Sequence, residues 1–122
     1  MARVVAYIPD LLFGSQVQGA LRAAGHEVEL VRDEEGVRGA LPKGADVLVV
    51  DLTDESARRA SLVEALVGEA DLDGVRTLAF YSHVEADTRA LAESTGFDLT
   101  VPRSRMAREG ANLIVRLAGG AS

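Results

Sequence analysis

The sequence predicts an α/β fold in which a parallel sheet is covered by helices on both faces. Short apolar runs rich in β-branched residues alternate five times with helix-like segments. Polar residues recur where each run ends, and the chain length of 122 residues fits a single domain over residues 1–122. Because every return from one strand to the next passes through a helix, we expect parallel strands joined by right-handed crossovers.

The first part of the chain predicts a strand, a helix and a second strand. Residues 3–9 are rich in β-forming residues and end at a proline, as a buried strand would. Apolar residues recur at helical spacing over residues 13–24, and Gly25 supplies a stop for that helix. Residues 27–31 alternate polar and apolar side chains, which is typical of a half-exposed edge strand.

The middle of the chain contains the most apolar strand. Asp33 can cap a short helix, which Pro42 and the glycine after it would end. Residues 45–51 then run apolar up to a carboxylate, as expected for a strand in the centre of a parallel sheet. Asp54 or Ser56 could cap the helix that follows.

The last part predicts two further strand and helix pairs. Residues 75–81 form a fourth strand, and residues 85–95 form a shorter helix stopped by Gly96. A brief strand over residues 99–101 precedes a final helix over residues 106–117. Five strands fit a three-layer, doubly wound sheet of the flavodoxin-like order 2-1-3-4-5.

Composition places the protein among globular domains. Hydrophobic residues make up 48% and charged residues 26%, close to the averages for such domains. The apolar stretches are far too short to span a membrane, and the N-terminus lacks a signal-peptide pattern, so we expect a cytoplasmic location. The absence of cysteine excludes disulfides, a thiol nucleophile and thiolate metal sites.

The charge balance restricts the class of partner. Thirteen basic residues against nineteen acidic ones give a net charge of −6, which repels phosphate backbones and anionic lipids. We therefore expect neither nucleic acid nor a membrane as a partner. The small basic group of Arg103, Arg105 and Arg108 has too few arginines to recognise a groove of nucleic acid, and it fits a contact with an anion or a carboxylate.

Five polar side chains follow the expected strands: Asp10, Asp51, Ser82, His83 and Arg103. In a sheet of this order, ligands bind outside the carboxyl ends of the strands, at the switch point between strands one and three. Asp10 and Asp51 would lie there. We therefore expect a polar crevice, in which Ser82 or His83 could hydrogen-bond a ligand or remain a polar loop residue.

The charged residues of this crevice have more than one interpretation. Asp51 is either a phospho-acceptor or anion-switch residue, or a turn aspartate after a strand. Asp10 fits a helix cap best, and otherwise could hold Arg103 or a metal ion. We expect Arg103 to pair with Asp51 because both follow strands at one edge, and Arg105 to assist where an anion binds. His26 lies on the opposite side of the sheet, which argues against a two-histidine metal site.

Two stretches resemble the receiver (CheY-like) domain of bacterial two-component response regulators, and the resemblance covers nearly the whole chain. They are ADVLVVDL, residues 45–52, and GFDLTVPR, residues 96–103. The resemblance places Asp51 at the phospho-accepting aspartate, and Arg103 at the lysine that follows strand five in the family. Arginine keeps the charge of that lysine and changes its geometry.

Other positions depart from the receiver pattern. Ile8 and Pro9 stand where the family has two adjacent acids that help to hold Mg²⁺, and Asp10 is one residue further on. Tyr81 replaces the family's switch threonine or serine, with Ser82 next to it. Mg²⁺ requires several oxygen ligands, and the remaining carboxylates supply few of them. We therefore expect no bound cofactor, no catalytic residue and no efficient aspartyl phosphorylation.

The resulting hypothesis is a stand-alone, atypical receiver, or pseudo-receiver. The stretches IPDLLF, FYSHV and VPRSRM are also similar to uncharacterised stand-alone receiver-like bacterial proteins. Such a domain is not an enzyme and would act through a protein partner or through self-association. The resemblance to receivers implies that the contact surface comprises the fourth helix, the fifth strand and the fifth helix. The alternatives are a working phospho-acceptor at Asp51, with Asp10 reaching the metal, and a small-molecule or anion-binding module in the same crevice.

Overall fold

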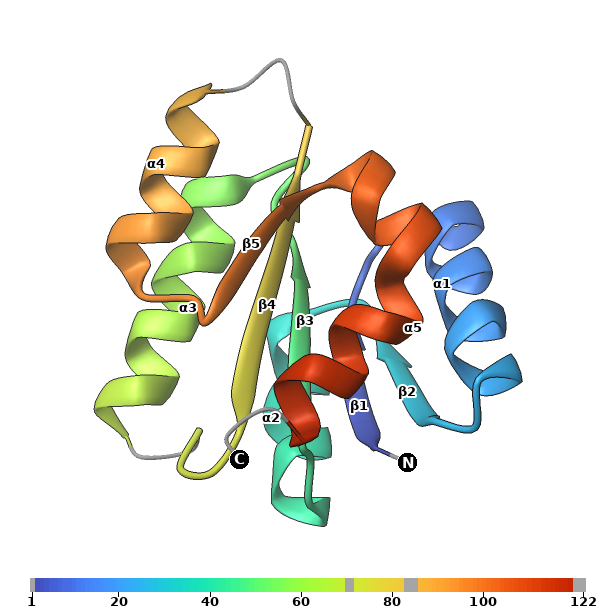
Figure 1. Cartoon of the computed structure of the whole chain (residues 1–122). Coiled ribbons are helices and arrows are strands. Elements are labelled where there is room, and N and C mark those ends of the chain that lie inside the picture. The colour runs from blue at the N-terminus through green and yellow to red at the C-terminus, as the bar shows by residue number, and fades with distance from the viewer. Residues whose placement is uncertain (1, 70–71, 83–85, 120–122) are drawn as a thin grey trace.

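The computed structural model describes residues 2–69, 72–82 and 86–119. Its centre is a five-stranded sheet in the order β2-β1-β3-β4-β5, in which every adjacent pair runs parallel. Helices cover both faces of the sheet (Figure 1). The predicted fold class and strand order are therefore confirmed.

Each strand is short, and the central ones are buried. The strands are β1 (Arg3–Tyr7), β2 (Glu27–Val31), β3 (Val47–Asp51), β4 (Arg76–Tyr81) and β5 (Leu99–Pro102). All five residues of β3 are buried, because strands lie on both sides of it and helices lie on both faces. The alternation in β2 correctly indicated an edge strand.

The helices divide into two layers. They are α1 (Leu11–Ala23), α2 (Glu34–Ala40), the 3₁₀ turn η1 (Leu41–Lys43), α3 (Ser56–Gly68), α4 (Ala86–Thr95) and α5 (Arg103–Gly119). Residues of α1 and α5 pack on one face of the sheet, and residues of α2, α3 and α4 pack on the other. The expected start of the last helix at residue 106 was wrong, because its first turn is polar and helical periodicity in apolar residues begins only at Met106.

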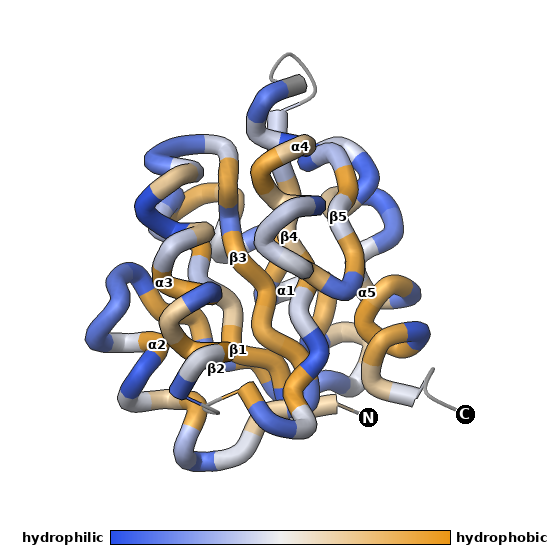
Figure 2. The backbone as a smooth tube through the Cα atoms, turned by 90° about the vertical axis from the view of Figure 1, so that its left-hand side faces the viewer, coloured by the Kyte–Doolittle hydropathy of each residue, from blue (hydrophilic) through white to orange (hydrophobic). Residues whose placement is uncertain are grey.

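The two cores follow from the alternation of side chains along each strand. Val4 and Ala6 of β1 face α1 and α5, whereas Val5 and Tyr7 face the other helix layer. Figure 2 shows the hydrophobic segments gathered in the strands at the centre of the molecule. The inner strands β1, β3 and β4 are therefore nearly continuously apolar.

Capping residues fix where the helices begin. Asp10 caps α1, since its Oδ1 accepts a hydrogen bond from the Phe13 backbone N–H at 2.9 Å. Asp33 caps α2 in the same way. The expectation that Asp54 or Ser56 caps α3 was wrong. Glu55 precedes that helix in a left-handed conformation, with φ of 46°, and makes no capping hydrogen bond.

Candidate functional site

The carboxyl ends of the strands form an open cavity of about 590 Å³. Its lining combines one arginine, three hydroxyls, one amide and two apolar side chains, contributed by Phe13, Gln16, Thr53, Ser82, Arg103, Ser104 and Ala107. This edge is the upper one in Figure 1, where β5 leads into α5 and β1 leads into α1. A cavity lies where the strand order predicts a crevice, and Ser82 and Arg103 line it, whereas Asp10 and Asp51 are not among its lining residues.

Asp51, the last residue of β3, is buried and is bonded to Thr53, which lines this cavity. Only 3% of its surface is exposed. Its Oδ1 accepts hydrogen bonds from the Thr53 backbone N–H, at 2.7 Å, and from the Thr53 hydroxyl. A carboxylate bound twice by the residue two positions ahead is held in a tight turn, so one of its oxygens is already satisfied within the chain.

Arg59 of α3 supplies the second contact to Asp51. Its side chain is only 5% exposed, and its Nη1 donates a hydrogen bond to the Asp51 backbone carbonyl at 2.9 Å. The same Nη1 lies 3.8 Å from Asp51 Oδ2, while Nη2 lies 3.7 Å from a carboxylate oxygen of Glu55. The guanidinium carbon also lies 5.4 Å from the centre of the Tyr7 ring. Asp51 therefore has an internal counter-ion.

Sequence reasoning missed Arg59, although a signal was present. The buried side of α3 carries Arg59, Leu62, Val63 and Leu66, which recur at the spacing of one helix face. An arginine at such a position must be neutralised by a buried partner, because an unpaired buried charge is costly. In a parallel sheet, the obvious partner is the carboxylate that ends the preceding strand.

The Arg59 site is not fully satisfied. Within the described part of the chain, Arg59 Nε has no hydrogen-bond partner and is buried. A buried donor without an acceptor costs about 1–3 kcal/mol, so the geometry around Asp51 carries a local free-energy penalty. The charge of Asp51 is therefore paired with that of Arg59, whereas one hydrogen-bond donor of Arg59 has no acceptor among the described residues.

Arg103 does not pair with Asp51, which corrects our expectation. Its Nη2 lies 3.9 Å from Asp10 Oδ2, and its guanidinium carbon lies 4.2 Å from the centre of the Phe13 ring. The reason is geometric: β3 and β5 are separated by β4, which places their ends roughly 10 Å apart. Asp10 thus serves both as the cap of α1 and as the partner of Arg103, two roles that the sequence had offered as alternatives.

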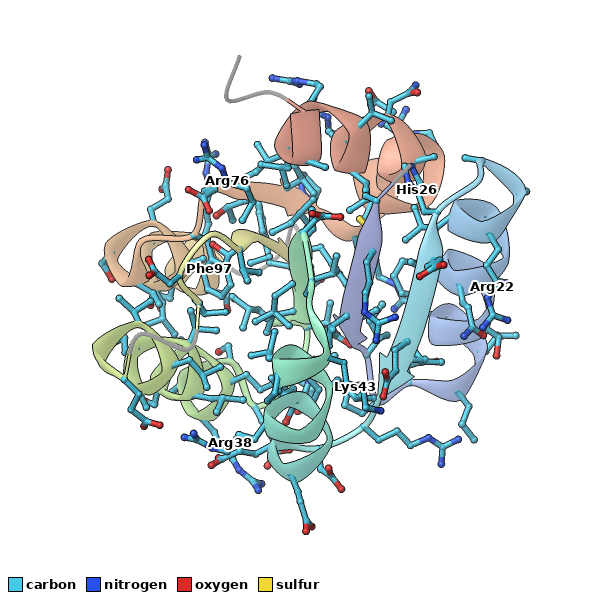
Figure 3. All side chains as sticks on the ribbon, turned by 90° about the horizontal axis from the view of Figure 1, so that it is seen from below. Arg22, His26, Arg38, Lys43, Arg76 and Phe97 are labelled. Atoms are coloured by element: carbon cyan, nitrogen blue, oxygen red, sulfur yellow. The ribbon has the colours of Figure 1, made fainter. Side chains whose placement is uncertain are left out.

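The other expected site residues lie in different surroundings. Arg105 forms an ion pair with Glu109 along α5, with 3.4 Å between Nε and Oε2. His83 lies outside the described residues. His26 is at the opposite edge of the sheet, as expected, where its Nδ1 accepts a hydrogen bond from the Ala2 backbone N–H at 3.1 Å (Figure 3).

The donor set does not fit a divalent cation. Among residues 2–69, 72–82 and 86–119, no group of three or more histidine or acidic side chains could hold a metal ion. Ile8 is buried and offers no carboxylate, while Asp10 and Asp51 are each engaged by an arginine. Mg²⁺ needs several free oxygen ligands in an octahedral array, and the described residues do not provide them.

No helix within the described part of the chain has the length and apolar character needed to cross a bilayer.

Comparisons with known proteins identify the fold. No protein-family model and no curated protein matches the sequence. The receiver domain of a Francisella response regulator superposes with a TM-score of 0.84 at 12% identity, covering 100% of both chains. A response regulator from Thermotoga maritima gives 0.80 at 14% identity, covering 96% of this chain and 97% of its own. The chemotaxis protein CheY4 of Vibrio cholerae gives 0.80 at 18% identity, covering 96% and 98%. The chain therefore has the fold of response-regulator receiver domains.

Proposed function

We propose that the protein is a cytoplasmic, receiver-like signalling or adaptor domain that acts by binding another protein, without efficient phosphorylation of Asp51. The observation that carries this proposal is the buried Arg59, whose guanidinium contacts the Asp51 carbonyl at 2.9 Å and lies 3.8 Å from its carboxylate. The receiver fold supports the signalling role. The contacts of the Asp51 carboxylate with Thr53 and Arg59 support the loss of phosphoryl transfer. We propose no substrate turnover.

Phosphoryl transfer to Asp51 would require a free carboxylate oxygen and a cation that offsets the charge of the incoming phosphate. Oδ1 is held by Thr53, and Oδ2 lies on the side of Arg59. A guanidinium carries one charge and donates hydrogen bonds, whereas a divalent ion carries two charges and coordinates phosphoryl and carboxylate oxygens directly. Moving Arg59 away would leave a buried charge unpaired, so access to Asp51 is opposed energetically.

Labelling with acetyl phosphate tests the proposal. In a competent receiver, an Asp51 oxygen attacks the phosphorus, the phosphoryl group moves to the carboxylate, and acetate leaves. We expect intact-mass spectrometry to find no phosphorylated protein after incubation with acetyl phosphate and Mg²⁺. Stoichiometric labelling that Asp51→Asn abolishes would show instead that the protein is a working receiver.

The cavity favours a second candidate function, the binding of a small anion. Arg103 is half-exposed and lines a space of about 590 Å³ together with the hydroxyls of Thr53, Ser82 and Ser104. A cation and several hydroxyls that converge on an open cavity suit a phosphate or carboxylate group. A thermal-shift screen with nucleotides, flavins and phosphorylated metabolites tests this function, and Arg103→Gln should remove any stabilisation. A flat screen would count against it.

A further inference from the structure

The strand β2 ends the sheet and leaves part of its backbone without a neighbouring strand (Figure 1). Only β1 lies beside it, and the Glu27 N–H donates to the Ala2 carbonyl at 2.9 Å where the two strands begin. Alternate residues of a strand direct their backbone groups to opposite sides, so every second residue from Glu27 onward faces β1. The backbone N–H and C=O groups of Val28 and Leu30 therefore point to the free edge of the sheet.

An open hollow of about 530 Å³ lies along this free edge. It is lined by residues 26–30, by Arg3 of β1, and by Gln18 and Arg22 of α1. We call residues 26–30 together with Gln18 and Arg22 the β2 edge. A strand added to the sheet would lie about 4.8 Å from β2. The hollow therefore offers space where such a strand can accept hydrogen bonds from the outward-facing N–H groups of β2.

His26 lines the same hollow and carries an unused hydrogen-bond donor. The residue is only 5% exposed, and its Nδ1 accepts a hydrogen bond from the Ala2 N–H at 3.1 Å. In a neutral imidazole whose Nδ1 is an acceptor, Nε2 carries the proton. This Nε2 is buried and has no hydrogen-bond partner among the described residues. Because a buried donor without an acceptor is costly, the site favours a ligand that presents an oxygen to it.

Arg22 carries the uncompensated charge in the lining of this hollow. The carboxylates of Glu27 and Glu29 lie 3.6 and 3.3 Å from guanidinium nitrogens of Arg3, so these three charges are paired with one another. Arg22 is exposed and has no acidic partner within the described residues. Its Nη2 donates to the outward-facing Val28 carbonyl at 3.4 Å, a long hydrogen bond. A carboxylate would be a stronger acceptor for this guanidinium than the carbonyl is.

We propose that the β2 edge binds an extended segment of a partner protein as an additional strand, with a glutamate or aspartate of that segment paired with Arg22. Backbone oxygens of the segment accept hydrogen bonds from the Val28 and Leu30 N–H groups, and one further oxygen accepts from His26 Nε2. This inference rests on the proposed role as a protein-binding domain. It names the contact surface, together with the conformation and the charge of the partner.

A second copy of the chain fits this edge poorly. In an antiparallel pair about a two-fold axis, outward-facing residues must oppose each other, so the axis passes through Val28, Glu29 or Leu30. The Glu29 axis opposes two copies of Glu29, and the Val28 axis opposes Glu27 with Glu29. The Leu30 axis pairs only residues 29–31 of each strand. Like charges directly opposite destabilise a strand pair, so a different protein is the better occupant.

Nuclear magnetic resonance with a designed peptide tests the proposal. The probe is an acetylated and amidated peptide of eight residues in which glutamate alternates with threonine, so that its only charges are side-chain carboxylates. We expect a dissociation constant on the order of 100 µM. At saturation, hydrogen exchange of the Val28 and Leu30 amides should slow by about threefold or more, and the His26 Nε2 proton should shift.

Two backbone-methylated peptides distinguish strand addition from other modes of binding. In an added strand, one alternate set of peptide residues faces β2 and the other set faces solvent. N-methylation of one set, either the glutamates or the threonines, should abolish binding, whereas N-methylation of the other set should preserve it. Equal effects of the two modifications would overturn the proposal.

Charge variants test the pairing with Arg22. Arg22→Gln should weaken binding of the glutamate peptide about threefold, and it should not change binding of a matched peptide with glutamine in place of glutamate. The matched control is Arg89→Gln on α4, where the side chain is 62% exposed. This control should bind both peptides like the unaltered protein. An equal loss in the two protein variants would contradict the proposal.

The remaining outcomes separate the proposal from its alternatives. Absence of binding at millimolar peptide would refute it, as would shifts confined to Thr53 and Ser104, which line the crevice. A homodimer in sedimentation whose formation protects the Val28 and Leu30 amides would refute it too. The acetyl phosphate assay does not depend on this edge, and Asp51→Asn should leave the peptide affinity unchanged. Failure of the β2 edge and failure of the proposed function can therefore be told apart.

Discussion

Replacing Arg59 with methionine should destabilise the protein by about 3 kcal/mol. The magnitude follows from the geometry around Asp51. Two opposite charges 3.8 Å apart interact by about 4 kcal/mol at an effective dielectric constant of about 20. The substitution also removes a charge-assisted hydrogen bond to the Asp51 carbonyl, while methionine retains part of the packing and removes the buried Nε donor. The net loss is therefore smaller than the sum of the lost contacts.

Urea unfolding followed by circular dichroism measures this loss. With a denaturant dependence of about 1.5 kcal/mol per molar urea, a loss of about 3 kcal/mol lowers the midpoint by roughly 2 M. The matched control is Arg58→Met, one residue earlier on α3, where the side chain is 71% exposed and pairs with Glu55 at 3.2 Å. That surface pair should contribute less than about 1 kcal/mol. Equal costs for the two substitutions would refute the conclusion that Arg59 is the internal counter-ion of Asp51.

A double variant adds a sharper test of the same pair. Asp51→Asn alone leaves Arg59 without its buried carboxylate partner, whereas Arg59→Met combined with Asp51→Asn leaves no buried charge at either position. We expect the double variant to be more stable than the sum of the two single losses predicts, with a coupling of about 1–3 kcal/mol. Strict additivity would mean that the two groups do not interact.

Three further predictions concern hydrogen bonds of the described structure. Thr53→Val removes the hydroxyl bonded to the carboxylate at the end of β3 and should cost about 1 kcal/mol in thermal unfolding, whereas Thr53→Ser should cost less. Asp10→Asn keeps the cap of α1 and loses only the exposed pair with Arg103, so it should be milder than Asp10→Ala, which should cost about 1–2 kcal/mol. His26→Leu leaves the buried Ala2 backbone N–H without its acceptor and should cost about 1–3 kcal/mol, while an equal stability of His26→Leu and the unaltered protein would show that this hydrogen bond is replaced.

The fold could be predicted from the sequence because its signals are local. A continuous apolar run that ends in Asp51 identifies a central parallel strand, and Asp33 directly before a short amphipathic segment identifies a helix start. Each of these signals acts within a few residues of the chain. The prediction of the capping residue of α3 was wrong because it used only such local signals. Glu55 precedes this helix, and its carboxylate contacts Arg58 and Arg59.

The charge pairing in the crevice could be predicted only in part, because it depends on the helix layers. The predicted order 2-1-3-4-5 already placed a strand between those that precede Asp51 and Arg103, and the expected pairing overlooked the separation that this strand imposes. Arg103 opens α5 and Asp10 caps α1, so the contact between the two helices brings these residues together. Arg59 reaches Asp51 from the opposite layer. Neither contact follows from strand positions alone.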